Sequence, residues 1–272
     1  MTEAHIVNVL STLTFNYKTT LPFPYGVVDG FLPEAVAENC LAEIERLPSA
    51  AWDRYDNLFE QKYTLRDKFH LPSATQSVFE ALSSSRVLHQ LIETVGEPSL
   101  CVDESRLWWG IHKFQNNDYL DIHSDAGVHP VTKQKKHGTL GIYLSSNWKP
   151  CNGGQLEIWD GTSVMDEQAK LTKKIAEVMP SFNRMIMFTN TTNAWHGSPI
   201  PCRIEPGDNA VRYFLTVSYL SENHSCEQHL ENTWEKAFFL PRPGDEPNPD
   251  KDRLRLLRAS AKTCHQVYRC IN

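Results

Sequence analysis

The segment TLGIYLSSNWKPCNGGQLEIW, residues 139–159, carries the clearest structural pattern in the chain. It contains two short apolar stretches, residues 139–144 and 154–159, with the β-branched and aromatic residues that strands favour. The connection KPCNGG between them is rich in proline and glycine, which is typical of a turn. Gly153 and Gly154 suit a tight turn because glycine adopts left-handed backbone conformations without a steric penalty. The segment therefore predicts two strands joined by a turn.

The same alternation of short strands and turns extends over about residues 101–220. Short strand-like stretches alternate with connections rich in Gly, Pro and Asn, such as QNND and IPCRIEPGDN. Seven or eight short strands at this spacing are typical of a sandwich, a jelly roll or a barrel. The predicted strands are residues 107–114, 119–123, 139–144, 154–159, 172–179, 184–189 and 211–219.

The segments on either side of this region are more helical. Residues 21–32 predict a short strand that enters a turn, and Pro33 suits the first position of a helix running to about Arg46. A second helical pattern covers residues 76–95, and the serine run at 83–85 can divide it.

We expect one structural domain built from three parts. Residues 1–100 form a support of helices and a strand, residues 101–222 form the β core, and residues 223–272 form a C-terminal extension. That extension contains the Pro-rich stretch FLPRPGDEPNPD, the most flexible connection expected in the chain, followed by a predicted terminal helix over residues 251–268.

Composition narrows the classes of function. The formal net charge is −6 and the pI is about 6.0, which disfavours a nucleic-acid partner. No apolar run reaches the roughly 20 residues that a membrane-spanning helix needs, and the N-terminus lacks the features of a secretory signal. The 7 cysteines are scattered and form no CxxC pair, which favours reduced thiols and a cytoplasmic location. These features leave the oligomeric state open.

The first candidate for chemistry is HSD, residues 123–125. In a strand, residues i and i+2 point to the same face, so His123 and Asp125 can bind one metal ion together. With 11 histidines in the chain an HxD pair also arises easily by chance. The best third ligand is His196 in NAWHGSPI, after the apolar stretch RMIMF. Two histidines and one carboxylate on one side of a metal are typical of non-haem Fe(II) oxygenases, which keep the remaining positions open.

Arg212 is the second candidate because it begins the apolar stretch RYFLTVSY. A buried guanidinium is costly without a partner, and a carboxylate can supply a bidentate one. An acid cosubstrate that chelates the metal at one end and pairs with Arg212 at the other satisfies both requirements. The alternative is that Arg212 reaches the surface or pairs with Asp208.

The ordered series HSD, GIYLSSNWKPCNGGQLEIW, FNRMIMFTNTTNAWHGSP and RYFLTVSY resembles the 2-oxoglutarate- and Fe(II)-dependent dioxygenases of the prolyl-4-hydroxylase-like superfamily. The similarity covers about residues 107–220, and PFPYGVVDGFLPEAVAENCLAEI and NLFEQKYTLRD also resemble the front part of bacterial members. The resemblance implies a mainly β fold with flanking helices around a double-stranded β-helix, the jelly-roll or cupin-like core, over residues 101–222.

The resemblance also implies roles for individual residues. His123, Asp125 and His196 would be the Fe(II) ligands, Arg212 would pair with the distal carboxylate of 2-oxoglutarate, and the Tyr143 hydroxyl would bond the same carboxylate.

Further residues are assigned to the pocket more indirectly. Strand alternation allows Thr139 and Thr216 to point into the cosubstrate pocket. We expect His112 and Trp195 to contact the substrate, Trp195 because it neighbours His196. Where the family usually has an aromatic residue upstream of HxD, this chain has Phe114 or Lys113, and neither supplies a tyrosine hydroxyl.

Together these features predict an enzyme that hydroxylates an unactivated C–H bond and releases succinate and CO₂. Its cofactors would be Fe(II), 2-oxoglutarate as cosubstrate and O₂, with ascorbate as a candidate reductant. Asp125 stands where related halogenases carry a small residue, which favours hydroxylation. The expected substrate is a small molecule, an amino acid or its derivative, selected by residues 50–70 and 126–138. The alternatives are a protein or peptidyl prolyl hydroxylase, a non-catalytic metal-binding or small-molecule-binding β-barrel module, and a cupin-like lectin or isomerase.

Overall fold

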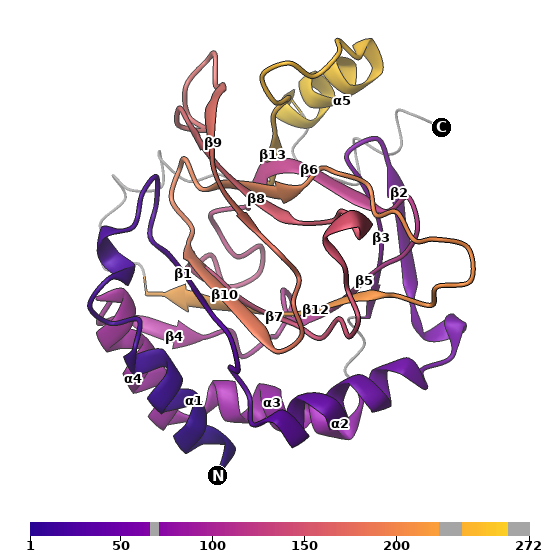
Figure 1. Ribbon diagram of the computed structural model, residues 1–272. Coiled ribbons are helices and arrows are strands. Elements are labelled where there is room, and N and C mark those ends of the chain that lie inside the picture. The colour runs from indigo at the N-terminus through magenta and orange to yellow at the C-terminus, as the bar shows by residue number, and fades with distance from the viewer. Residues whose placement is uncertain (66–70, 223–235, 261–272) are drawn as a thin grey trace.

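The computed structural model describes residues 1–65, 71–222 and 236–260. In this part of the chain thirteen strands pair into one antiparallel sheet that curls into a nearly closed barrel (Figure 1). The strands are β1 Tyr25–Val28, β2 Asp53–Asn57, β3 Glu60–Leu65, β4 Leu100–Val102, β5 Gly110–Phe114, β6 Tyr119–Ser124, β7 Lys135–Tyr143, β8 Leu156–Gly161, β9 Leu171–Val178, β10 Arg184–Thr189, β11 Trp195–Ser198, β12 Arg212–Ser221 and β13 Phe238–Phe239. The helices are α1 Thr2–Ser11, α2 Glu34–Glu45, α3 Ser73–Ser83, α4 Ser85–Val95 and α5 Pro249–Ser260.

The order of the strands is that of a jelly roll. The sheet runs β1-β10-β7-β12-β5-β3-β6-β11-β8-β9, with β4 on β12, β2 on β3 and β13 on β6. Neighbours in space are mostly distant in sequence, so the chain crosses repeatedly from one side of the barrel to the other. The predicted fold class, mainly β with flanking helices and a jelly-roll core, is confirmed.

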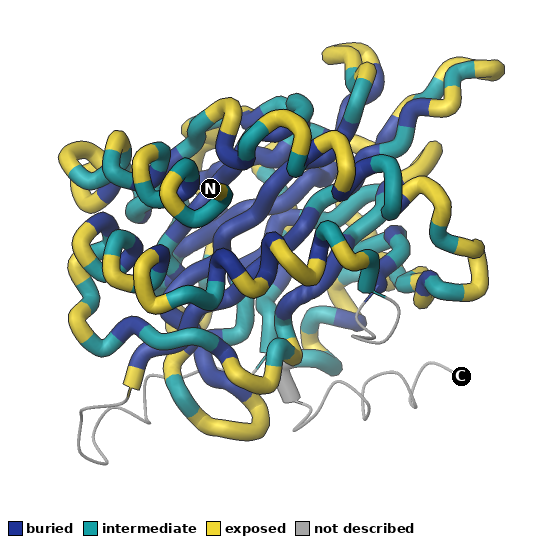
Figure 2. The backbone as a smooth tube through the Cα atoms, turned by 90° about the horizontal axis from the view of Figure 1, so that it is seen from below, coloured by how far each residue is buried: buried dark blue, intermediate teal, exposed yellow. Residues whose placement is uncertain are grey.

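Helices α1 to α4 cover the outside of the wall formed by β7, β12 and β5 (Figures 1 and 2). Leu10, Ile44, Phe79 and Leu91 of these helices are buried in the same apolar core as Leu215 of β12. Burying one apolar face of each helix against the sheet is what holds amphipathic helices of this length in place.

The serine run divides the second helical pattern, as expected. Ser84 separates α3 from α4, and its hydroxyl accepts a hydrogen bond from the Val87 backbone N–H, at 3.4 Å, as the N-cap of α4. Gly96 ends α4 in the left-handed conformation, with φ of 76°, that a helix C-terminus favours.

The structure differs from the predicted elements at several points. Strand β11 was not predicted because it is only four residues long and follows a turn-rich segment. Strand β7 begins at Lys135 rather than at the predicted residue 139. The sequence missed its first residues because they are polar. The charged stretch before residue 66 forms the hairpin β2–β3. Helix α5 covers the first part of the predicted terminal helix, and positions 261–268 lie outside the described residues.

The segment 236–260 packs against the end of the barrel. Phe238 and Phe239 of β13 pair with Ser124 and His123 of β6, and Leu254 of α5 packs in a small apolar cluster with Phe59 and Phe239. No helix in the described ranges has the length and apolarity needed to cross a bilayer.

Two adjacent tryptophans provide a test of this packing. Trp109 is 3% exposed, stacks edge-on against Phe79 of α3 and donates its indole N–H to the Ser218 carbonyl at 2.9 Å. Trp108 is only half-buried, and both tryptophans border the same cavity. We expect Trp109→Ala to lower the free energy of unfolding by about 3–5 kcal/mol and Trp108→Ala to lower it far less. Urea denaturation measures both, and equal losses would contradict the packing described.

Candidate active site

Cross-strand pairing brings two histidines together. His196 of β11 lies directly opposite His123 of β6 in the antiparallel ladder, and their ring centroids are 4.5 Å apart. Gly197, the next residue of β11, allows this approach because a Cβ there would lie 2.6 Å from the Asp121 carbonyl oxygen. The predicted histidine pair is therefore brought together by strand register.

Hydrogen bonds fix the orientation of both imidazoles. His123 Nδ1 lies 3.0 Å from the Asp121 carbonyl and His196 Nδ1 lies 2.9 Å from the Ala194 carbonyl. A carbonyl only accepts, so each Nδ1 carries the proton and each Nε2 presents its lone pair. Burial, together with the neighbouring His123, lowers the pKa of His196 to about 3. His196 is therefore neutral at neutral pH, as metal ligation requires.

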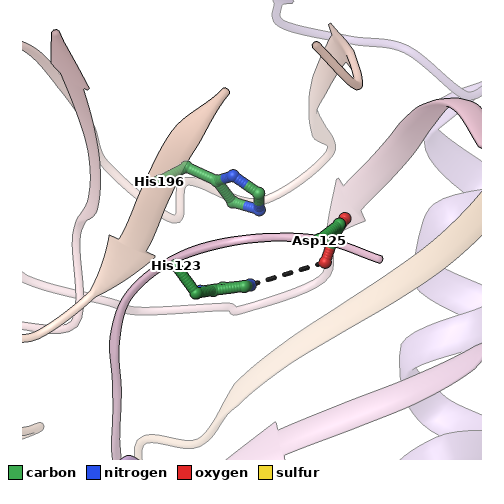
Figure 3. Close-up of side chains that lie close together, drawn as sticks. All are labelled: His123, Asp125 and His196. Atoms are coloured by element: carbon green, nitrogen blue, oxygen red, sulfur yellow. Dashed lines mark ion pairs between the residues drawn. The ribbon is translucent and has the colours of Figure 1, made fainter. Parts of the chain in front are cut away.

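Asp125 completes the group (Figure 3). It follows the last residue of β6, and its Oδ1 lies 3.5 Å from His123 Nε2. One ligand atom from each of His123, Asp125 and His196 lies within 4.8 Å of the others. Two imidazole nitrogens and one carboxylate oxygen on one side of a metal position form the donor set that suits Fe(II).

Lys136 of β7 holds the other oxygen of Asp125. Its Nζ lies 2.7 Å from Asp125 Oδ2, which the Thr139 hydroxyl also approaches at 3.4 Å. Burial alone would raise the pKa of Asp125, but the charge of Lys136, with smaller contributions from contacts to His123 and His196, holds it well below its usual range. Lys136 was not predicted. It reaches this face because β7 is irregular at His137, where the register against β12 shifts between Gly138 and Lys136.

A cavity of about 370 Å³ opens beside the three residues. Its wall contains the predicted pocket residues Thr139, Thr216, His112 and Arg212. His112 Nε2 lies 3.2 Å from the Thr216 hydroxyl. The wall also includes residues that the sequence did not single out, mainly from β3, the loop after Asp125 and the C-terminal segment: Glu60, Lys62, Trp108, Ala126, Pro130, Lys136, Phe188, Ser198, Phe214, Lys236, Phe239 and Arg258.

Arg212 is buried at the inner part of this cavity and is only 2% exposed. Its Nη2 donates to the Ser198 hydroxyl at 3.1 Å, while Nε and Nη1 have no hydrogen-bond partner among the described residues. The alternatives of a surface position or a pair with Asp208 are wrong, because Asp208 pairs with Lys149 at 3.0 Å. Two unpaired buried donors of a permanent cation fit a carboxylate ligand.

Two predicted residues lie away from the cavity surface. Tyr143 is fully buried behind Arg212, with its hydroxyl 3.4 Å from Arg212 Nη2. Trp195 is also fully buried, donates its indole N–H to the Thr162 carbonyl at 2.8 Å and packs against Trp159 and Leu171. The structure thus gives no support to the predicted substrate contact of Trp195. Alternation in β11 explains this, since the neighbours of His196 face the opposite side.

Comparison with known families agrees with the geometry. Residues 109–220 match the family model of the 2OG-Fe(II) oxygenase superfamily. The chain contains an oxygenase domain of this superfamily. Fe(II), 2-oxoglutarate and O₂ are therefore its cofactors and cosubstrates, and they supply the oxidising chemistry, coupled to decarboxylation of 2-oxoglutarate. His123, Asp125 and His196 fit the metal, and Arg212 fits the carboxylate of the cosubstrate.

Solved structures of prolyl hydroxylases share the fold of this oxygenase. A Pseudomonas putida prolyl-4-hydroxylase is 14% identical, with a TM-score of 0.54 over 80% of this chain and 99% of that one. A Trichoplax adhaerens prolyl hydroxylase in complex with a peptide fragment of hypoxia inducible factor is 14% identical, with a TM-score of 0.53 over 80% and 90%. A prolyl 4-hydroxylase from Phytophthora capsici is 17% identical, with a TM-score of 0.52 over 85% and 72%. No curated protein sequence matches the chain.

The unpaired donors of Arg212 lead to a first prediction for the site. Arg212→Met removes the cation that would pair with 2-oxoglutarate, and truncating one partner of a buried charge pair costs about 2–5 kcal/mol. We expect the KM for 2-oxoglutarate to rise at least about 30-fold, measured from initial rates of succinate formation. The exposed Arg203 provides the control, because Arg203→Met removes the same charge outside the cavity. An unchanged KM in Arg212→Met would contradict the role.

The ion pair of Lys136 and Asp125 leads to a second prediction. Lys136→Met releases Asp125 Oδ2, and loss of such a partner of a metal ligand typically costs about 10–100-fold in metal affinity or activity. We expect a fall of this size in succinate formation at saturating Fe(II) and 2-oxoglutarate. Lys135→Met, at the exposed neighbouring position, should keep the wild-type rate. Thermal melting of both variants separates this effect from unfolding.

Proposed function

We propose that this oxygenase hydroxylates a C–H bond of a small molecule, an amino acid or a derivative of one. In the overall reaction, substrate, O₂ and 2-oxoglutarate give hydroxylated substrate, succinate and CO₂, with one oxygen atom in each of the first two products. The observation that carries the proposal is the wall of the cavity beside the His-Asp-His group, which the C-terminal segment helps to form.

That wall begins at the metal ligand His123. Phe239 of β13 pairs with His123 through the backbone, and its ring lies nearly parallel to the imidazole with centroids 5.4 Å apart. Lys236 and Arg258 from the same segment also line the cavity. A volume of about 370 Å³ lies within the range of small-molecule pockets, roughly 300–1,000 Å³. The position of β13 on the edge of β6 favours a compact substrate over an extended chain.

Different residues of the cavity are proposed to bind the cosubstrate, bind the metal and form the apolar wall. Arg212 would hold the far carboxylate of 2-oxoglutarate, and His123, Asp125 and His196 would hold the Fe(II). Phe114 contacts the Arg212 guanidinium, with 4.2 Å from Cζ to the ring centroid, and Phe214 and Phe188 add apolar wall. Such surroundings exclude water and strengthen the electrostatic contacts made inside.

A peptidyl prolyl hydroxylase is the second candidate. It is favoured by the solved structures of similar fold, which are prolyl hydroxylases, one of them in complex with a peptide. A peptide in this cavity would have to fit beside the C-terminal residues Phe239 and Arg258, which line it.

The proposed reaction is tested by mass spectrometry and a succinate assay. Purified protein with Fe(II), ascorbate and 2-oxoglutarate is incubated with a panel of amino acids, their derivatives and prolyl peptides. We expect succinate release with a product heavier by one oxygen atom from a small molecule, and its loss in Asp125→Ala. A product from the peptides alone would establish the second candidate instead. No turnover above Asp125→Ala over the whole panel would contradict the function and favour a non-catalytic binding module.

A further inference from the structure

Four charged side chains on the cavity wall remain once the site described above is assigned. Asp125 pairs with Lys136, and Arg212 is the proposed partner of the cosubstrate carboxylate. The remaining charged residues are one carboxylate and three cations: Glu60, Lys62, Lys236 and Arg258. A substrate at this wall therefore meets charged groups of both signs.

Among these four side chains, Glu60 and Lys62 carry opposite charges and lie side by side. They are two residues apart on β3 and so share its cavity face, with Glu60 Oε2 and Lys62 Nζ 2.8 Å apart. Their side chains are only 15% and 10% exposed. Burial raises the pKa of Glu60, but Lys62, with smaller contributions that include His123, brings it below its ordinary value. Glu60 therefore carries its negative charge at neutral pH.

A largely buried ion pair of this kind contributes little to stability by itself, because desolvation offsets much of the attraction. Each partner also keeps hydrogen-bonding capacity, since a carboxylate accepts about four hydrogen bonds and an ammonium group donates three. A pair that adjoins a cavity can therefore bind a ligand that carries the complementary charges, an ammonium group beside Glu60 and a carboxylate beside Lys62.

We propose that Glu60 and Lys62 recognise the two charged groups of a zwitterionic amino acid, with its ammonium group on Glu60 and its carboxylate on Lys62. Trp108 and Phe239, which line the same cavity, contact the apolar part of the ligand. This inference rests on the proposed function and deepens it by naming the chemical class of the substrate and the residues that select it.

The test measures binding separately from turnover. Protein loaded with Mn(II) and 2-oxoglutarate is titrated calorimetrically with the L-amino acids, and with the N-acetyl and carboxamide derivatives of each. We expect at least one free amino acid to bind and each derivative to bind at least 10-fold more weakly, because each lacks one of the two charges.

Variants then assign each charge to its residue. Glu60→Gln should weaken binding of the free amino acid at least 10-fold and leave its N-acetyl derivative within twofold of its affinity for wild type. Lys62→Met should do the same for the free amino acid and the carboxamide. Asp56→Asn and Lys173→Met remove the same charges at exposed positions outside the cavity and should bind as wild type does.

The outcomes separate this inference from the proposed reaction. It is overturned if no free amino acid binds, or if Glu60→Gln and Lys62→Met weaken the free acid and its derivatives equally. A wild type that oxidises a peptide or an uncharged molecule overturns it while the oxygenase reaction stands. Selective binding without any consumption of 2-oxoglutarate upholds the binding site and contradicts the proposed function.

Discussion

The pairing of His123 with His196 across β6 and β11 is the constraint around which the site is built. Backbone hydrogen bonds of an antiparallel ladder fix the register to a single residue, and a slip of one would turn an imidazole to the other face. Strand β11 lies between β6 and β8, so both of its edges are paired. The two nitrogens are therefore positioned by strand pairing on both sides of β11.

Asp125 is held in a different way. It lies just beyond β6, where the ladder no longer determines the direction of its side chain. Its position comes from the charge of Lys136, supported by backbone contacts of the following residues: the Lys136 N–H donates to the Gly127 carbonyl, and the Asn190 amide donates to the Ala126 carbonyl. The donor set thus combines two ligands fixed by strand pairing with one fixed by an ion pair.

The substrate side of the cavity depends on the end of the chain. The jelly roll supplies the side proposed for the cosubstrate through β7, β11 and β12, whose residues Thr139, Ser198 and Arg212 line the cavity. The opposite side is completed by β3 and by the segment that carries β13 and α5. The likeness to prolyl hydroxylases lies in the shared fold, whereas the charges at this second side belong to segments outside residues 109–220. This division explains why reaction class and substrate class require different arguments.

The sequence by itself indicated the strand-rich region and the set His123, Asp125, His196 and Arg212, because these depend on local patterns and on spacing along the chain. The pattern left sandwich, jelly roll and barrel open, and the family resemblance selected the jelly roll. The sequence also divided the second helical pattern correctly at its serines, a local capping effect. Strand β11 was not predicted from the sequence because four residues are too few to show a periodic pattern. Lys136 was not predicted because the irregularity at His137 breaks the alternation from which the face of a strand residue is inferred. Trp195 was expected at the substrate because it neighbours His196 in sequence, and in the strand this neighbour faces the other side. The sequence assigned substrate selection to residues 50–70 and 126–138, and Glu60 and Lys62 of the first range line the cavity. That these two side chains face the C-terminal wall was decided only by the tertiary structure, since the two segments are more than a hundred residues apart and meet through packing.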